Sequence, residues 1–224
     1  MNLENLSWVG VKEYLKKRQD ILLPFGSVEE HGYHLPLSTD GDIVQAICEG
    51  ISKKTGILVA PLVWYGVSNT TKSYTGTTMV EPDTLKAYTK DILKALKNSG
   101  FTPVHITSGH YSNAHIDAIK EGAGGSDIDT RFLDFSKIDF SSILETKPFH
   151  ACEAETSLMM HLHPEKVDME KAVDEDVEIV DDQLVPTKSG VFGYPTKATA
   201  KKGKLLFDAI VKELADAIEQ EKGQ

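Results

Sequence analysis

Apolar runs rich in valine, isoleucine and leucine alternate along the chain with segments of helical period. The runs at residues 20–27, 56–64, 102–107 and 129–135 predict strands, and a weaker run at residues 177–180 predicts a peripheral one. Strands that are apolar throughout and separated by helices are typical of a mostly parallel sheet covered on both faces. The pattern therefore predicts an α/β protein.

Amphipathic stripes predict the helices. The clearest covers residues 82–99, where Pro82 suits a first turn and Gly100 can close the end. Residues 42–54 and 199–220 show the same period, and we expect all three stripes to pack in the core.

Two stretches lack such a pattern and are predicted to be long loops, at residues 66–79 and 135–149. Long loops in compact domains are often functional. No internal repeat and no Pro/Gly/Ser-rich linker divides the chain. Residues 1–224 are therefore expected to form a single domain.

Charge and composition exclude several partners. The 24 Lys and Arg residues stand against 34 Asp and Glu residues, a net charge of -10, and the arginines are only Arg18 and Arg131. Nucleic acid would be repelled by such a field. No apolar run approaches the roughly 18 residues of a membrane span. The chain carries two cysteines, too few for a disulfide framework. We expect a cytoplasmic protein that binds neither nucleic acid nor membrane.

The first candidate site follows the first predicted strand, at residues 24–40. Open α/β sheets place ligands at the carboxyl ends of their strands. In extended backbone Glu29 and His31 point the same way, and Asp40 returns from the loop. Carboxylate and imidazole suit Zn, Mn or Fe. The alternative interpretation is a solvated polar loop.

A second candidate, residues 107–113, also follows a strand and contains His110. The carboxyl ends of parallel strands meet at one sheet edge, so His110 is expected near the first site. A buried imidazole bonded to backbone is the alternative. Ser112 or Asn113 can equally cap a following helix.

The third candidate is residues 150–160. If this segment is helical, Glu155 lies on an apolar stripe, where a carboxylate needs a metal or another cation. Glu153 lies about 200° round the helix from Glu155, by the period of an α-helix, and is expected to be exposed.

These segments resemble the creatininase family, the creatinine amidohydrolases. The resemblance is carried by GSVEEHGYHLPLSTD at 26–40, GHYSN at 109–113 and HACEAETS at 150–157. Supporting matches are GTT at 76–78, EPDTL at 81–85, GVFG at 190–193 and ATAKKG at 198–203. The family implies a three-layer α/β/α sandwich, a two-metal centre, hydrolysis of a cyclic amide or other non-peptide C–N bond, and commonly a hexamer.

The resemblance also implies the ligands of two divalent ions per chain, as Zn, Mn or Fe. Glu29 would bind one ion, His31 the other, and Asp40 would bridge them. His110 would be a further ligand, and Glu155 would complete the centre.

The sequence departs from the family at the substrate side. In creatininase itself a metal-binding glutamate occupies the position of Ser112, and Tyr194 stands where an aspartate is usual. Many relatives have a histidine in the loop that here reads SNTTKSY at 68–74. The substrate is therefore expected to differ. Residues predicted to contact it are Tyr74, Tyr111, Ser112 and Glu153.

The resulting hypothesis is a dinuclear amidohydrolase in which a water bridging the ions is the nucleophile. His150 would protonate the departing nitrogen. The substrate remains open among creatinine, a ring-opened formamidopyrimidine nucleotide, a cyclic sugar ketone and a short peptide. Two other hypotheses are a metal-dependent isomerase or lyase acting on a sugar-like ketone and a non-catalytic oligomeric family member.

Overall fold

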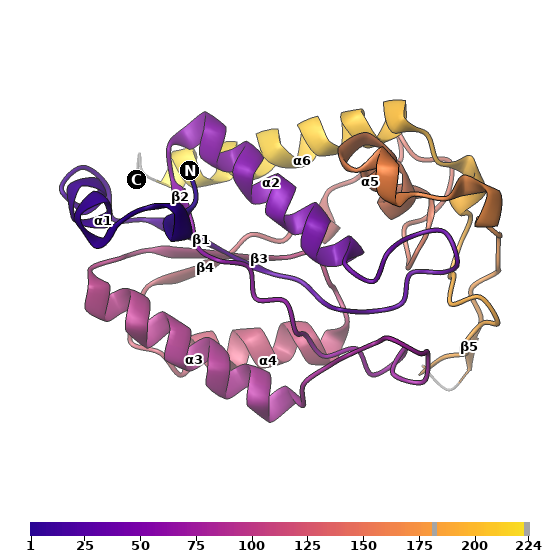
Figure 1. Ribbon diagram of the computed structural model, residues 1–224, viewed down its shortest axis with the longest axis horizontal. Helices are drawn as coiled ribbons and strands as arrows, with labels where there is room; N and C mark the ends of the chain where they lie inside the picture. The colour runs from indigo at the N-terminus through magenta and orange to yellow at the C-terminus, as the bar shows by residue number, and fades with distance from the viewer. Residues whose placement is uncertain (181–182, 222–224) are drawn as a thin grey trace.

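A parallel sheet separates two layers of helices in the computed structural model, which describes residues 1–180 and 183–221 (Figure 1). The strand order is β2-β1-β3-β4. The strands are β1 (Ile21–Phe25), β2 (Leu58–Val59), β3 (Val104–Ser108) and β4 (Thr130–Phe132). The predicted three-layer α/β/α sandwich with a parallel central sheet is confirmed.

The alternation of side chains along β1 explains why both faces are covered. Leu22 packs into a core with the helices of one layer, whereas Ile21 and Leu23 pack into a second core with the helices of the other layer. The first layer consists of α2 (Thr39–Thr55), α5 (Glu153–Leu162) and α6 (Ala200–Glu221). The second consists of α3 (Pro82–Ser99) and α4 (Asn113–Gly124), with α1 (Trp8–Leu15) beside it. Each side of the sheet thus has its own apolar core.

Helix α3 has the bounds that the sequence predicts. Pro82 is its first residue, and Gly100 closes it with a left-handed φ of 98°, a conformation that glycine adopts without strain. Helix α2 begins earlier than its apolar stripe, which places Asp40 in the first turn. The amino-terminal end of a helix favours a negative charge there. Helix α1 has no buried residue, and the sequence pattern missed it.

The strand prediction at residues 56–64 is too long, since β2 has only two residues. Pro61 lacks the N–H that a continuing ladder needs. The chain rejoins β1 at Val63, whose N–H donates to Pro24 O at 3.0 Å. The weak run at 177–180 contributes β5 (Ile179–Val180), which pairs with β6 (Gln183–Leu184) outside the main sheet. It is peripheral, as predicted.

The carboxyl ends of β1 and β3 lie side by side. Phe25 is paired with Ser108, and Gly109 N–H donates to Phe25 O at 2.9 Å. A Cβ at Gly109 would lie 2.1 Å from Asp40 O, so only glycine lets the start of α2 approach this edge. The fold therefore brings residues 26–40 and 109–113 together.

Among the described residues, none of the helices combines the length and apolar character that a bilayer crossing requires.

Candidate metal centre

Glu29, Asp40 and His110 meet at the carboxyl edge of the sheet, and all three are buried. His110 Nδ1 lies 2.9 Å from Glu29 Oε2 and 3.1 Å from Asp40 Oδ2. Two carboxylates and an imidazole with their ligand atoms within 4.8 Å of one another form an O,O,N donor set. Such a set suits zinc or manganese.

The loop 66–79 fixes this group from one side. Ser68 Oγ donates to Glu29 Oε2 at 3.0 Å, and Thr71 Oγ1 donates to Glu29 Oε1 at 2.7 Å. The Val67 carbonyl accepts a hydrogen bond from His110 Nε2 at 2.9 Å, which leaves Nδ1 as the ligand nitrogen. The predicted functional loop thus orients two side chains, although no sequence signal named Ser68 or Thr71.

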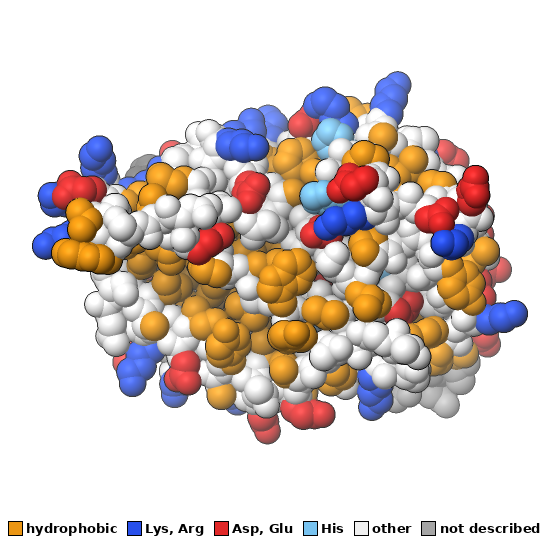
Figure 2. All heavy atoms as spheres, in the orientation of Figure 1, with side chains coloured by type: hydrophobic (Ala, Val, Ile, Leu, Met, Phe, Trp, Pro, Cys, Tyr) orange, Lys and Arg blue, Asp and Glu red, His pale blue; other side chains and the backbone are white. Residues whose placement is uncertain are grey.

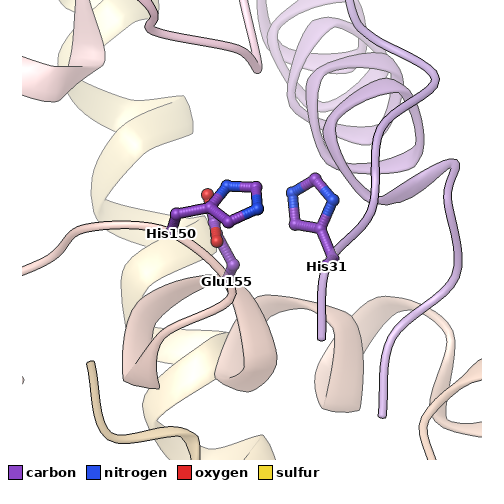
Figure 3. Close-up of side chains that lie close together, drawn as sticks. All are labelled: His31, His150 and Glu155. Carbon is purple, nitrogen blue, oxygen red and sulfur yellow. The ribbon is translucent and has the colours of Figure 1, made fainter. Parts of the chain in front are cut away.

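A second group consists of His31, His150 and Glu155. Figure 3 shows the two imidazoles facing one another with the carboxylate beside His150, and the ring centroids are 4.3 Å apart. His31 is fully buried, while the other two are half-buried. His31 Nδ1 donates to Glu29 O at 3.1 Å, so Nε2 is the ring nitrogen available as a metal ligand.

Asp40 joins the two groups. Its Oδ1 lies 3.1 Å from His31 Nε2, and its Oδ2 lies 3.1 Å from His110 Nδ1. Ser27 Oγ also donates to Oδ2 at 2.7 Å. One carboxylate therefore presents one oxygen to each group.

Glu30 holds His150 in place. His150 Nε2 donates to Glu30 O at 2.8 Å and lies 3.2 Å from Glu30 Oε1. Gly190 has a left-handed φ of 85°, which favours glycine, and a Cβ there would lie 1.8 Å from Glu30 Oε2 and displace the carboxylate. The sequence motif contained Glu30 without a role for it.

Glu155 carries a buried oxygen, Oε2, for which the described residues offer no hydrogen-bond partner. Burial raises the pKa of this carboxyl. An unsatisfied buried carboxylate oxygen is costly, and a cation would satisfy it. Ala151, just before α5, has φ of 50°, an unusual backbone conformation for a residue other than glycine. The donor sets and this oxygen fit divalent ions.

Opposite charges face one another within the centre. Burial disfavours ionisation of the carboxyls, but His110 outweighs it and lowers the pKa of Glu29 to about 2. Burial likewise opposes the charge of Asp40, yet His31 and His110 hold its pKa well below the usual range. Burial also works against a protonated His31, but Asp40 raises its pKa to about 10. The imidazole and carboxylate groups therefore stabilise one another's charged forms.

A cavity of about 560 Å³ opens beside both groups and is lined by Glu29, Asp40, His110, His150 and Glu155. Tyr111 and Ser112, predicted to contact substrate, also line it. Their hydroxyls are engaged elsewhere: Tyr111 Oη accepts from Phe135 N–H at 3.2 Å, and Ser112 Oγ donates to Val67 O at 2.8 Å.

Two other predicted substrate contacts lie elsewhere. Glu153 is buried, so the expectation of an exposed side chain is wrong. It accepts from Lys202 Nζ at 2.6 Å and from Thr146 N–H at 2.8 Å, partners that the period of one helix does not reveal. Tyr74 donates to Thr187 O. Neither Glu153 nor Tyr74 is among the described residues that line the cavity, and their contact with substrate stays a prediction.

Comparison with known proteins gives a consistent picture. Residues 4–218 match the sequence model of the family described as creatininase, creatinine amidohydrolase. A creatinine amidohydrolase from Pseudomonas putida is 31% identical, over 90% of this chain and 89% of its own length. A mycofactocin precursor peptide peptidase from Mycolicibacterium smegmatis is 26% identical, over 89% of this chain and 84% of its own.

The fold is shared with solved proteins. A crystal structure of creatininase superposes with a TM-score of 0.88 and 26% identity, covering 98% of this chain and 97% of that one. Further creatininase structures of similar likeness are named as a manganese form and as a zinc–zinc form of a mutant.

Proposed function

This chain belongs to the creatininase family and is a hydrolase acting on C–N bonds, and we propose that it hydrolyses a cyclic amide or other non-peptide C–N bond with two divalent ions. The observation that carries the proposal is the Asp40 carboxylate, which turns one oxygen to each of two donor groups. A carboxylate so placed is suited to bridge two cations.

We assign the ligands by group. Glu29 and His110 hold one ion, His31 and Glu155 hold the other, and Asp40 binds both. Two observations support the assignment: Glu155 Oε2 has no hydrogen-bond partner among the described residues, and His31 Nε2 and His110 Nδ1 face the carboxylates. Zinc, manganese and iron all accept such oxygen and nitrogen donors. When bound, two ions lower the pKa of water to near neutrality and polarise a carbonyl.

His150 is the proton donor in this proposal. Burial and the charge of His31 lower its pKa, but the hydrogen bond with Glu30 and nearby carboxylates outweigh them, so the net shift is upward. The surroundings therefore favour the protonated form of the imidazole. Because the ring lines the cavity, it can deliver that proton to a departing nitrogen.

The proposal defines the type of reaction more closely than the identity of the substrate. Ser112 cannot supply the charge of a metal-binding glutamate, and its hydroxyl is bound to the Val67 carbonyl. Creatinine therefore ranks with other cyclic amides and with formamides as a substrate to be tested.

Elemental analysis of the purified protein, followed by a screen of creatinine, lactams and formamides, tests the proposal. We expect about two divalent ions per chain, and hydrolysis that disappears on chelation and returns on reloading. Fewer than about one tightly bound ion per chain after reloading would favour the non-catalytic alternative. Equal hydrolysis by stripped protein would refute the mechanism. Product lacking ¹⁸O from labelled water would favour the isomerase or lyase.

We also propose a homo-oligomer, a hexamer by resemblance to the family. Figure 2 shows hydrophobic side chains gathered on the face between α2 and α3. Trp64 and Tyr65, which follow β2, and Tyr88 on α3 are exposed aromatics. Contiguous apolar surface often marks a protein interface. A monomer by light scattering would contradict this proposal.

A further inference from the structure

The cavity beside the metal centre continues into the apolar core. Ile43 of α2, Leu158 of α5, and Leu206 and Ile210 of α6 line it, and each is at most 4% exposed. These side chains belong to the core between α2, α5 and α6. One wall is therefore formed by hydrophobic side chains from three helices of a single layer.

The loop 135–149 contributes further apolar side chains to the lining. Phe135, Ile138, Phe140 and Leu144 line the cavity from this loop. Apart from the two donor groups, the charged residues among the described lining are Asp139 and Lys147. Lys147 is exposed, so a phosphate or carboxylate in the buried part of this space, away from the donor groups, would lack the cationic partner that burial of a charge requires.

The loop is anchored, so the space it encloses is held open. The Glu153 carboxylate accepts from the N–H groups of Glu145 and Thr146 at 3.1 and 2.8 Å. Lys202 Nζ of α6 donates to Glu145 at 2.7 Å and to Glu153 at 2.6 Å. A partly buried ion pair thus connects the loop to the first turns of α5 and α6, and the binding space is largely formed before substrate arrives.

The volume of about 560 Å³ is in the range of sites that enclose drug-sized ligands. A small polar ring such as creatinine would fill a fraction of it and leave the apolar walls without contacts. An apolar group would remove those walls from water and gain affinity with each added carbon.

We infer that the substrate carries an apolar group, an alkyl chain or an aromatic ring, next to its scissile amide. This group occupies the space bounded by Ile43, Leu158 and Ile210 and covered by Ile138. The inference rests on the proposed hydrolase function and specifies its substrate class.

The test is the binding of acetamide, butanamide and hexanamide to metal-loaded and to chelator-stripped protein, measured by competition or calorimetry. We expect affinity to rise about fourfold for each added methylene. The value of kcat/KM should rise in the same way from acetamide through butanamide to hexanamide. An affinity that is flat with chain length, in protein that holds its metal, overturns the inference and leaves the hydrolase proposal standing.

Ala154→Leu places extra volume in the cavity, since Ala154 lines it. We expect this variant to lose most of the preference for hexanamide over acetamide. Ala95→Leu, the same change at an exposed position of α3, should retain it. Ile138 is a half-buried position of the loop. Ile138→Ser replaces an apolar side chain of the cavity lining by a smaller polar one and should lower the preference for hexanamide over acetamide about tenfold.

A preference unaffected by both Ala154→Leu and Ile138→Ser overturns the inferred location. If the protein fails to retain metal after reloading, the hydrolase proposal is contradicted. If binding by that protein still depends on chain length, the apolar site is supported. The two claims therefore fail separately.

Discussion

The two donor groups share Asp40 but differ in how the protein completes them. In the Glu29–Asp40–His110 group every member is buried and bonded by neighbouring side chains or backbone. In the other group His150 and Glu155 are half-buried, and Glu155 Oε2 lacks a partner among the described residues. The contacts of the first group, called the closed group below, fix the positions of its donor atoms. The second, called the open group below, lies beside the cavity with fewer contacts of this kind.

Their origins in the chain explain the difference. The first group comes from the ends of β1 and β3 and from the first turn of α2, three elements that pack directly on one another. The second group also uses Glu155 of α5 and His150, and His150 precedes Ala151, whose backbone conformation is unusual. A sheet edge is a rigid support, whereas a helix start beside a long loop leaves the cavity accessible.

Asp40→Ala should abolish the distinction between the groups, because it removes an oxygen from each. We expect loss of both ions and hydrolysis at the background rate, measured by elemental analysis and turnover with circular dichroism to verify folding. Asp42→Ala is the matched control, since Asp42 lies on the same helix and pairs with Lys166 at 2.7 Å. Retention of two ions in Asp40→Ala would show that the groups are independent.

His150→Ala should affect only the open group and only its chemistry. Because His150 acts as a proton donor in the proposal, we expect metal content to remain and kcat to fall by about 10²–10⁴-fold. His161→Ala on α5, whose ring contacts Phe207, is the control. If His150→Ala loses one of the two ions, the imidazole is a ligand and the assigned role is wrong.

The closed group was largely predictable from sequence. Glu29 and Asp40 lie in the stretch that follows an apolar strand, and His110 follows another strand. In a parallel sheet the carboxyl ends of such strands meet, so their convergence follows from topology. The bounds of α3 were equally predictable, since Pro82 and Gly100 act through local backbone geometry.

Partners supplied by distant, aperiodic segments were not predictable. Ser68 and Thr71 come from a loop whose conformation no hydrophobic period encodes. The helical period placed Glu153 away from Glu155 but did not show that Lys202 of α6 covers that face. A helical wheel gives the direction of a side chain and leaves its surroundings undetermined.

Thr71→Val gives the finest test of the closed group, because it removes one hydrogen bond and retains the shape of the side chain. Thr71 Oγ1 donates to Glu29 Oε1 at 2.7 Å, while Ser68 still holds the other oxygen. Loss of a partner that orients a metal ligand lowers metal affinity by about tenfold. Competition with a chromophoric chelator measures this, and Thr70→Val, at the exposed neighbouring position, should leave affinity unchanged. Equal affinity in Thr71→Val and wild type would mean that Glu29 is oriented by the metal itself, and the closed group would then be no more preorganised than the open one.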